Sequence, residues 1–338
     1  MLYITTRNNN DAYTAYRTLG QGRGPDRGLF IPFQMPHLDK EQIYALREKS
    51  FGQNMADILN LFFKARLDGW DVDFCIGRYP AKLVPMSHRI MVAETWHNPD
   101  HDFARVVRNL SSRIRGIEDK TGHPTNWAWI TMRIATLFAL FGEMYKLNTL
   151  EPDQLIDVAL PSGDFAGPMA VWYAREMGLP VGNIICSCDD NDATWDLLHQ
   201  GSIYPNASMN IPSDLERLVA AAMGKEEAKR YAACMENAKP YVPAKEGVDA
   251  MKKGMYAAVI SWERRENIIN SVYRTSTYIL DPGSAMAYGG LQDFRAGAGE
   301  TTRQALILTE RGPICSAETV ARAMGIKIPA LRERLNLA

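Results

Sequence analysis

The sequence predicts an α/β protein in which a parallel sheet is flanked by helices, and three observations support this class. Helix and strand patterns alternate along the 338 residues. Hydrophobic residues make up 46% of the chain, which is enough for a substantial core. A strand pattern over 155–160, a helix pattern over 168–177 and a strand pattern over 183–188 form one unit. This unit predicts two parallel strands joined by a right-handed crossover.

The N-terminal half is predicted to begin with a short strand over 2–5 and a helix over 11–19, followed by two helices within 39–63. The helix pattern over 127–147 is the strongest in the sequence, because it is apolar on nearly every side. Such a helix is expected to be buried, either against a sheet or against a partner subunit.

The C-terminal half continues the alternation. Ser213 to Glu216 have the spacing of a capping box, which predicts a helix that continues to Met223. The further predicted elements are a largely helical segment over 256–274, a turn over 280–284 that leads into another helix, a strand over 305–309 and a helix over 317–324.

Composition and charge argue against several classes of function. The formal net charge is -1, so no general basic surface predicts nucleic-acid binding. The N-terminal sequence is not that of a signal peptide, and no run of about 18 apolar residues predicts a membrane span. The five cysteines are irregularly spaced, which argues against a disulfide framework or a zinc site and favours a cytoplasmic protein with reduced thiols. They are Cys75, Cys186, Cys188, Cys234 and Cys315.

The loop from Ser162 to Gly167 lies between the strand over 155–160 and the following helix. Backbone N–H groups and the helix dipole favour an anion such as a phosphate at this position, and Gly163 and Gly167 would let it approach closely. The alternative is that the loop is only a turn. Asp164 would repel a phosphate dianion, so its carboxylate is expected to cap the helix.

Several segments are similar, in the same order, to the motifs of one enzyme family. They are 21–32 (QGLAPDGGLYxP), 126–147 (NSINxxRxxxQxxYYF), 162–167 (SGNFGN), 177–181 with 191–192 (MGLPI and NEND), 280–282 (LDPHTA) and 313–320 (HPAKFPEAV). The chain therefore resembles threonine synthase, a fold-type II pyridoxal-phosphate enzyme of the tryptophan-synthase-β type. The resemblance implies the large-domain fold of that family. It also implies that the cofactor-phosphate loop consists of Ser162, Gly163, Asp164, Phe165, Ala166 and Gly167.

The chain departs from the family at positions that carry its chemistry. Residues 94–105 are similar to ELFHGPTLAFKD, which contains the Schiff-base lysine, but Ala104 occupies the lysine position. In the phosphate loop, Asp164 replaces an asparagine and Ala166 replaces a glycine. Glu310 stands where the family has a threonine near the pyridine nitrogen. An alanine cannot form the imine with which pyridoxal chemistry begins.

The small domain of the family is largely deleted. Only about ten residues connect Arg115 to Asn126, too few for a domain. We therefore expect two parts, an N-terminal threonine-synthase-like segment over 1–90 and a truncated α/β domain over 91–338. The expected function is a threonine-synthase-like pseudoenzyme without a cofactor, with a binding or structural role and a tendency to form homo-oligomers.

Two alternatives keep an enzymatic role. In the first, Lys120 serves as the imine lysine and the chain remains a pyridoxal-phosphate enzyme. In the second, the chain is a repurposed enzyme whose Ser162–Gly167 loop holds a small anionic metabolite. The side chains expected to bind this metabolite are Arg105, Arg108, Asn191 and Glu310. The two arginines belong to a cationic run, and the alternative interpretation of that run is a solvated helix face.

Two further clusters have a structural reading. His97 and His101 have a spacing that suits a metal on a helix, but Pro99 between them argues against a regular helix, so no metal site is expected. The acidic segment 189–192 follows a strand end, where α/β proteins often bind ligands, and it also suits a helix N-cap. The cap is the favoured interpretation. A protein partner remains the alternative to a small anionic ligand.

Overall fold

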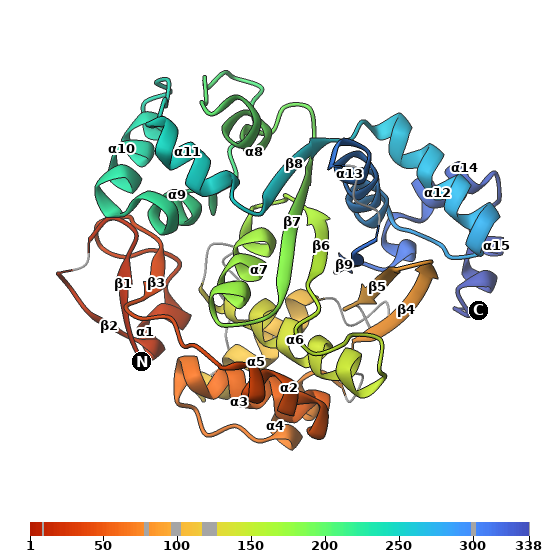
Figure 1. Cartoon of the computed structure of the whole chain (residues 1–338), viewed down its shortest axis with the longest axis horizontal. Helices are drawn as coiled ribbons and strands as arrows, with labels where there is room; N and C mark the ends of the chain where they lie inside the picture. The colour runs from red at the N-terminus through yellow and green to blue at the C-terminus, as the bar shows by residue number, and fades with distance from the viewer. Residues whose placement is uncertain (9, 78–80, 96–102, 117–126, 299–301, 338) are drawn as a thin grey trace.

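The computed structural model describes residues 1–8, 10–77, 81–95, 103–116, 127–298 and 302–337 (Figure 1). At its centre lies a six-stranded sheet with the order β4 (Lys82–Ser87), β5 (Ile90–Glu94), β9 (Gln304–Thr309), β6 (Ile156–Pro161), β7 (Val181–Cys188) and β8 (Met255–Val259). β4 runs antiparallel to β5, and the other neighbouring strands are parallel. The predicted α/β class with a mainly parallel sheet is confirmed.

Alternate residues of the inner strands pack into two separate cores. Val158 and Leu160 of β6 belong to the larger core, whereas Ala159 between them belongs to the smaller one. β7 repeats the pattern, with Ile184 in the larger core and Ile185 in the smaller one. Successive side chains of a strand point to opposite faces, and both faces of a parallel sheet are covered. This explains why these strands are continuous apolar runs in the sequence.

Helices cover both faces of the sheet (Figure 1). The larger core contains α3 (Phe51–Phe63), α6 (Trp127–Lys146) and α7 (Ala166–Glu176). The smaller core contains α12 (Trp262–Ser276), α13 (Pro282–Ala298) and α14 (Ala317–Met324). α6 packs against α3 and α7 of the same chain. Its apolar character is therefore explained without a partner subunit.

The N-terminal segment forms a small antiparallel sheet with the order β2 (Tyr13–Thr14), β1 (Leu2–Thr5) and β3 (Phe30–Pro32). The hydroxyl of Tyr3 donates to the Phe62 carbonyl at 2.9 Å, and its ring lies edge-on to Trp127. This sheet is therefore fixed to the larger core by a buried side chain of its central strand.

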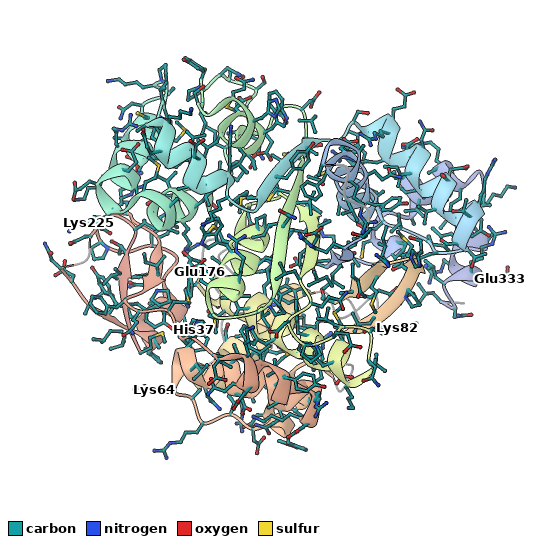
Figure 2. The ribbon with its side chains drawn as sticks, in the orientation of Figure 1. His37, Lys64, Lys82, Glu176, Lys225 and Glu333 are labelled. Atoms are coloured by element: carbon teal, nitrogen blue, oxygen red, sulfur yellow. The ribbon has the colours of Figure 1, made fainter. Side chains whose placement is uncertain are left out.

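The chain after this sheet is held against the end of α7. His37 lies near Glu176 (Figure 2), with its Nδ1 atom 3.2 Å from the Glu176 carbonyl oxygen. The Leu38 amide donates to the Met177 carbonyl at 2.8 Å. At Gly178 φ is +114°, and a Cβ atom there would collide with the Leu38 carbonyl oxygen. Only glycine therefore fits at the end of this helix.

The remaining elements surround these layers. The helices are α1 (Ala15–Gly20), α2 (Lys40–Tyr44), α4 (Gly69–Cys75), α5 (Phe103–Arg115), α8 (Ala193–Trp195), α9 (Leu215–Met223), α10 (Lys225–Glu236), α11 (Lys245–Lys252) and α15 (Ile328–Arg334), with short turns of other helix types at Ala45–Glu48, Asp196–Gln200 and Pro313–Ser316. No helix in the described ranges is long and apolar enough to span a membrane. The expected division of the chain into a segment over 1–90 and a domain over 91–338 stays a prediction.

Three of the predicted elements are wrong in detail. The segment over 256–274 contains the strand β8 before α12, because its first apolar residues pair with β7 in the central sheet. Before α1 begins at Ala15, Tyr13 and Thr14 pair with β1. Asp214 precedes α9 without a side-chain capping bond. It forms an ion pair with Arg217 instead, so the predicted capping box is absent there.

Candidate functional site

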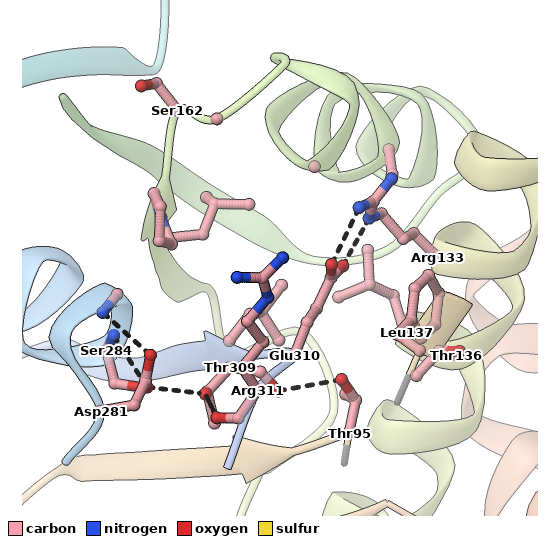
Figure 3. Close-up of a pocket in the computed structure, with 18 of the residues that line it drawn as sticks. Thr95, Arg133, Thr136, Leu137, Ser162, Asp281, Ser284, Thr309, Glu310 and Arg311 are labelled. Atoms are coloured by element: carbon pink, nitrogen blue, oxygen red, sulfur yellow. Dashed lines mark hydrogen bonds and ion pairs between the residues drawn. The ribbon is translucent and has the colours of Figure 1, made fainter. Parts of the chain in front are cut away.

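A cavity of about 370 Å³ opens at the carboxyl ends of β5, β6 and β9. This is the edge where open α/β sheets usually bind their ligands. One wall is apolar and comes mainly from α6, and the polar wall comes from the strand ends and from the starts of α7 and α13 (Figure 3). The polar residues that line it are Thr95, Arg133, Thr136, Ser162, Asp164, Asp281, Ser284, Thr309, Glu310 and Arg311.

Four residues of the predicted phosphate loop line the cavity, namely Ser162, Gly163, Asp164 and Gly167, but two backbone amides of the loop are already occupied. Gly163 and Phe165 both have left-handed conformations, with φ of +51° and +68°. The Phe165 amide donates to the Ser162 carbonyl at 2.7 Å. The Ala166 amide donates to the Asp164 carboxylate at 3.0 Å. The Asp164 carboxylate therefore accepts a hydrogen bond from the first amide of α7, as expected for a cap. Two amides of the loop thus donate to acceptors within the loop itself.

Ser162 is fixed by residues behind the cavity. Its hydroxyl donates to Asp192 at 2.9 Å, and its amide donates to the Ser187 carbonyl at 2.7 Å. Asp192 also accepts from the Thr194 amide at 2.8 Å, so it caps α8 as expected for the acidic segment. Both side chains are buried. The Ser162 hydroxyl is thus held as a donor in a structural network.

Arg133 and Glu310 form an ion pair inside the cavity (Figure 3). The Nε atom of Arg133 donates to one carboxylate oxygen at 2.5 Å and a terminal nitrogen donates to the other at 2.8 Å. Burial alone would lower the pKa of Arg133, but the Glu310 carboxylate outweighs burial and raises this pKa. The guanidinium therefore stays charged, and its other terminal nitrogen is buried without a partner among the described residues.

Arg311 contributes a second guanidinium. Its side chain points into the cavity beside Glu310 (Figure 3). Among the residues that the structure describes, it has no carboxylate partner. Sequence reasoning missed Arg133 and Arg311 as cavity residues. For Arg133 a signal was present, because an arginine inside a helix that is apolar all round must find a buried partner.

Several hydroxyl groups of the cavity donate hydrogen bonds to neighbouring strand ends and to Asp281. Thr95 donates to the Thr309 carbonyl at 2.9 Å, and Thr309 donates to Asp281 at 3.0 Å. Ser284 also donates to Asp281, which accepts the Gly283 amide at 2.9 Å and so caps the start of α13. None of the described residues that line the cavity is a lysine, histidine or cysteine. The described lining therefore offers neither a lysine for an imine nor a histidine as a general base, and its Ser284 and Thr309 hydroxyls donate to the Asp281 carboxylate, which also caps α13.

A buried acid lies directly behind the loop. The backbone amide of Asp214 donates to the Asp164 carbonyl at 3.0 Å, and its carboxylate pairs with Arg217. Both charged side chains are fully buried. Burial raises the pKa of Asp214 to about 6, with the negative charge of Asp164 adding to this and Arg217 opposing it. Protonation behind the loop is thus coupled to the charge on Asp164.

Three of the predicted ligand-binding residues lie outside the cavity lining. Ala104, Arg105 and Arg108 are on α5, whose buried face is formed by other side chains of that helix, so both arginines are exposed. Asn191 is exposed and donates to the Ser208 carbonyl at 2.7 Å. Of the four predicted ligand-binding side chains, Glu310 lines the cavity. The helix phase of α5, set by its apolar face, turns Arg105 and Arg108 to solvent.

The remaining candidates lie outside the described residues. These are the histidine-containing segment 96–102, with His97 and His101, and Lys120. Within the described part of the chain, no cluster of three histidine, cysteine or acidic side chains could hold a metal ion.

Comparison with known proteins finds sequence similarity to threonine synthases in part of the chain. The family model described as "Threonine synthase N terminus" matches residues 2–78. Human "Threonine synthase-like 1" is 25% identical over 176 residues, covering 48% of this chain and 24% of that protein. Threonine synthase of Pseudomonas aeruginosa is 28% identical over 183 residues, covering 50% of this chain and 38% of that protein. The chain thus matches less than two fifths of the length of each of these relatives.

Solved structures show the same fold. The pyridoxal-phosphate-bound threonine synthase of Brucella melitensis superposes with a TM-score of 0.85 at 19% identity, covering 98% of this chain and 93% of that one. The yeast enzyme gives a TM-score of 0.85 at 16% identity, covering 100% of this chain and 94% of that one. At these identities the likeness concerns the fold. The expected α/β fold, with a mainly parallel sheet flanked by helices, is therefore confirmed, and the match extends over nearly the whole of these solved chains.

Proposed function

Because the chain is a threonine-synthase-like protein in its N-terminal sequence and its fold, we propose that it is a pseudoenzyme that has lost pyridoxal-phosphate catalysis and uses the retained cavity for non-covalent binding. The observation that carries this proposal is the Arg133–Glu310 ion pair in a cavity whose described lining contains no lysine. Pyridoxal phosphate, when bound, supplies an electron sink through an imine with a lysine.

The cavity residues fit that cofactor poorly. A phosphate at the Ser162–Gly167 loop would meet the Asp164 carboxylate and two amides that already bind within the loop. A pyridine ring near Glu310 would compete with Arg133 for the carboxylate. Ala104 cannot form an imine. These features support the loss of the ancestral reaction rather than a displaced catalytic lysine.

A titration with pyridoxal phosphate tests this proposal. The purified protein is mixed with the cofactor, reduced with borohydride and analysed by intact mass and peptide mapping. We expect no stoichiometric adduct, and only scattered modification of exposed lysines such as Lys64 and Lys82 (Figure 2). One cofactor per chain attached to a single lysine, Lys120 included, would refute the proposal.

Arg311 favours a second candidate function, the binding of a small carboxylate-bearing metabolite, with or without turnover. Its guanidinium enters the cavity without a carboxylate partner among the described residues, and a planar fork of donors suits a carboxylate. A panel of small carboxylates should raise the melting temperature of the wild type. The shift should be lost in Arg311→Gln, and retention of the shift in that variant would reject this function.

The proposal also includes the cellular location and the oligomeric state of the protein. The chain composition supports a cytoplasmic location with reduced thiols, and all five cysteines are unpaired. A homo-oligomer is the expected assembly, and the exposed, stacked rings of Trp70 and Phe74 on α4 are a surface that self-association would cover. Light scattering of the wild type and of Trp70→Ala tests this expectation.

A further inference from the structure

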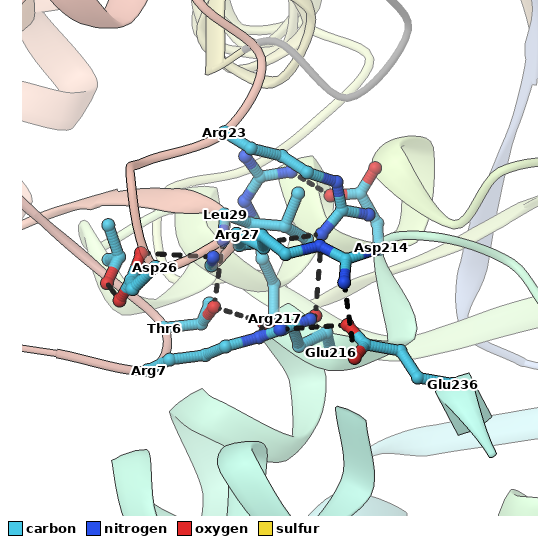
Figure 4. Close-up of polar contacts among 12 residues, drawn as sticks. Thr6, Arg7, Arg23, Asp26, Arg27, Leu29, Asp214, Glu216, Arg217 and Glu236 are labelled. Atoms are coloured by element: carbon cyan, nitrogen blue, oxygen red, sulfur yellow. Dashed lines mark hydrogen bonds and ion pairs between the residues drawn. The ribbon is translucent and has the colours of Figure 1, made fainter. Parts of the chain in front are cut away.

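We propose that a second cavity, between the N-terminal loop and helices α9 and α10, binds the phosphate group of a small phosphomonoester. The cavity has a volume of about 300 Å³ and is separate in its lining from the one described above. Three arginines and two glutamates form its charged part (Figure 4). They are Arg7, Arg23, Arg27, Glu216 and Glu236.

Arg7 makes the direct hydrogen bonds to both carboxylates. Its Nε and one terminal nitrogen donate to the two oxygens of Glu216, both at 2.9 Å, and the other terminal nitrogen donates to Glu236 at 3.0 Å. Thr6 donates its hydroxyl to Glu216 at 2.5 Å. One arginine therefore makes the direct hydrogen bonds to both glutamates, and three guanidinium charges against two carboxylates leave a net charge of +1 in this lining.

Arg23 and Arg27 keep donors for a ligand. Arg23 lies 3.7 Å from Glu216, and Arg27 lies 3.7 Å from Glu236. These separations are longer than a direct hydrogen bond. The guanidinium of Arg27 donates to no other described residue, whereas Arg23 donates once, to the Arg27 carbonyl at 2.8 Å. A bound anion could accept from both side chains without breaking the existing pairs.

The loop holds Arg27 in an unusual conformation. Its φ is +65°, a region that glycine adopts freely and that costs other residues about 1 kcal/mol or more. In the similar QGLAPDGGLYxP motif this position is a glycine and that of Arg23 is a leucine. Both departures thus introduce a guanidinium at the same cavity. A strained backbone position that carries an arginine is a sign of function.

Tyr231 supplies an independent observation. It lines the same cavity, its side chain is 3% exposed, and its hydroxyl has no partner among the described residues. A buried hydroxyl without a partner is costly, and a phosphate oxygen reaching it would remove that cost. Burial raises the pKa of Tyr231, which keeps the hydroxyl protonated as a donor.

The arrangement of donors favours phosphate over carboxylate. Arg23 and Arg27 come from the N-terminal loop and Tyr231 comes from α10, so the donors belong to two separate parts of the wall. A phosphate presents three charged oxygens in different directions, whereas a carboxylate presents two in one plane. The apolar residues of the cavity give the organic part of a phosphomonoester a surface to contact. They are Ile211, Pro212, Ala232 and Met235.

Calorimetric titration of the full chain at low ionic strength tests the proposal, with inorganic phosphate and glycerol phosphate as probes. Arg27→Gly should weaken the binding of both probes by about tenfold or more, because charge-assisted hydrogen bonds are lost. Glycine suits the backbone at this position, so the variant should fold at least as stably as the wild type. Arg23→Leu should weaken binding to a similar extent.

Two control variants locate the effect. Arg66 is exposed and also has a positive φ, +55°, so Arg66→Gly makes the same change far from this lining and should leave affinity within about twofold. Arg311→Gln removes a guanidinium of the first cavity and therefore reports whether the probes bind there instead. Tighter binding of glycerol phosphate than of phosphate assigns its organic part to the apolar wall. Absence of binding to the wild type, equal loss in Arg27→Gly and Arg66→Gly, or loss confined to Arg311→Gln would overturn the proposal.

Discussion

Arg133 of α6 and Glu310, directly after β9, are 177 positions apart in the sequence and meet through two hydrogen bonds inside the main cavity. Arg133 also packs over the neighbouring rings of Phe103 and Trp129, with its guanidinium carbon 5.2 and 5.3 Å from the two ring centres. The pair therefore joins α6 to the carboxyl end of β9, an inner strand of the central sheet. It also fills cavity space that a ligand would otherwise occupy.

Breaking this pair from one side should destabilise the fold. Glu310→Gln leaves the buried Arg133 charge without a counter-charge, and we expect the free energy of unfolding to fall by about 1–3 kcal/mol. Urea denaturation measures this. Arg311→Gln, at an exposed neighbouring position, should change it by roughly 0.5 kcal/mol or less. Equal stability of Glu310→Gln and the wild type would show that the pair does not stabilise the contact between α6 and the end of β9.

Replacing both partners separates pairing from desolvation. In Arg133→Leu/Glu310→Leu neither charge remains, so the double variant should recover most of the stability lost in Glu310→Gln, as often occurs for buried pairs. The measurement is the same denaturation series at one pH. A double variant that is less stable than Glu310→Gln would mean that the hydrogen bonds, rather than the unpaired charge, dominate the loss.

Asp214 should make stability depend on pH. Its folded-state pKa of about 6 is above the ordinary value, so its stabilising contribution is complete below about pH 4 and is lost as pH rises through 6. The difference between the ordinary and the folded-state pKa of Asp214 corresponds to about 3 kcal/mol. Between pH 4 and 7 the stability of Asp214→Asn should therefore rise by about that amount relative to the wild type.

A matched control isolates this titration from that of other carboxylates. Asp190 is exposed, so Asp190→Asn should follow the wild type across the same pH range. Asp164→Asn is informative as well, because the Asp164 charge helps to raise the pKa of Asp214 while an asparagine oxygen can still accept the Ala166 amide. The pH dependence should shrink in that variant. If Asp214→Asn keeps the pH dependence of the wild type, that dependence comes from other titratable groups.

Local patterns in the sequence were sufficient to predict the fold class, because β6, α7 and β7 are long apolar elements whose periodicity does not depend on distant neighbours. They were also sufficient for the Asp164 cap, since a side chain and an amide two residues on are adjacent in the chain. The β4–β5 hairpin and β8 were missed. β4 is half exposed and β8 is a five-residue edge strand that reads as part of the following helix.

The sequence could not identify the charged residues of the cavity. Arg105 and Arg108 form a conspicuous run, but the apolar face of α5 decides which way that helix turns, and it leaves them exposed. Arg133 reaches the cavity because α6 is buried on all sides and its partner comes from the end of a strand far along the chain. Such a pairing depends on tertiary packing, which periodicity alone does not contain.

The backbone of the Ser162–Gly167 loop gives a further prediction. At Gly163 φ is +51° and a Cβ atom would meet no atom within 4 Å, so the cost of Gly163→Ala is conformational. We expect a loss of about 1–2 kcal/mol in the free energy of unfolding. Gly297 in α13 is the matched control, because a Cβ atom there also meets nothing within 4 Å and no positive φ is present. Gly297→Ala should stabilise the protein by about 0.5–1 kcal/mol. If both variants change stability in the same direction, the left-handed conformation of Gly163 is not what shapes this side of the cavity.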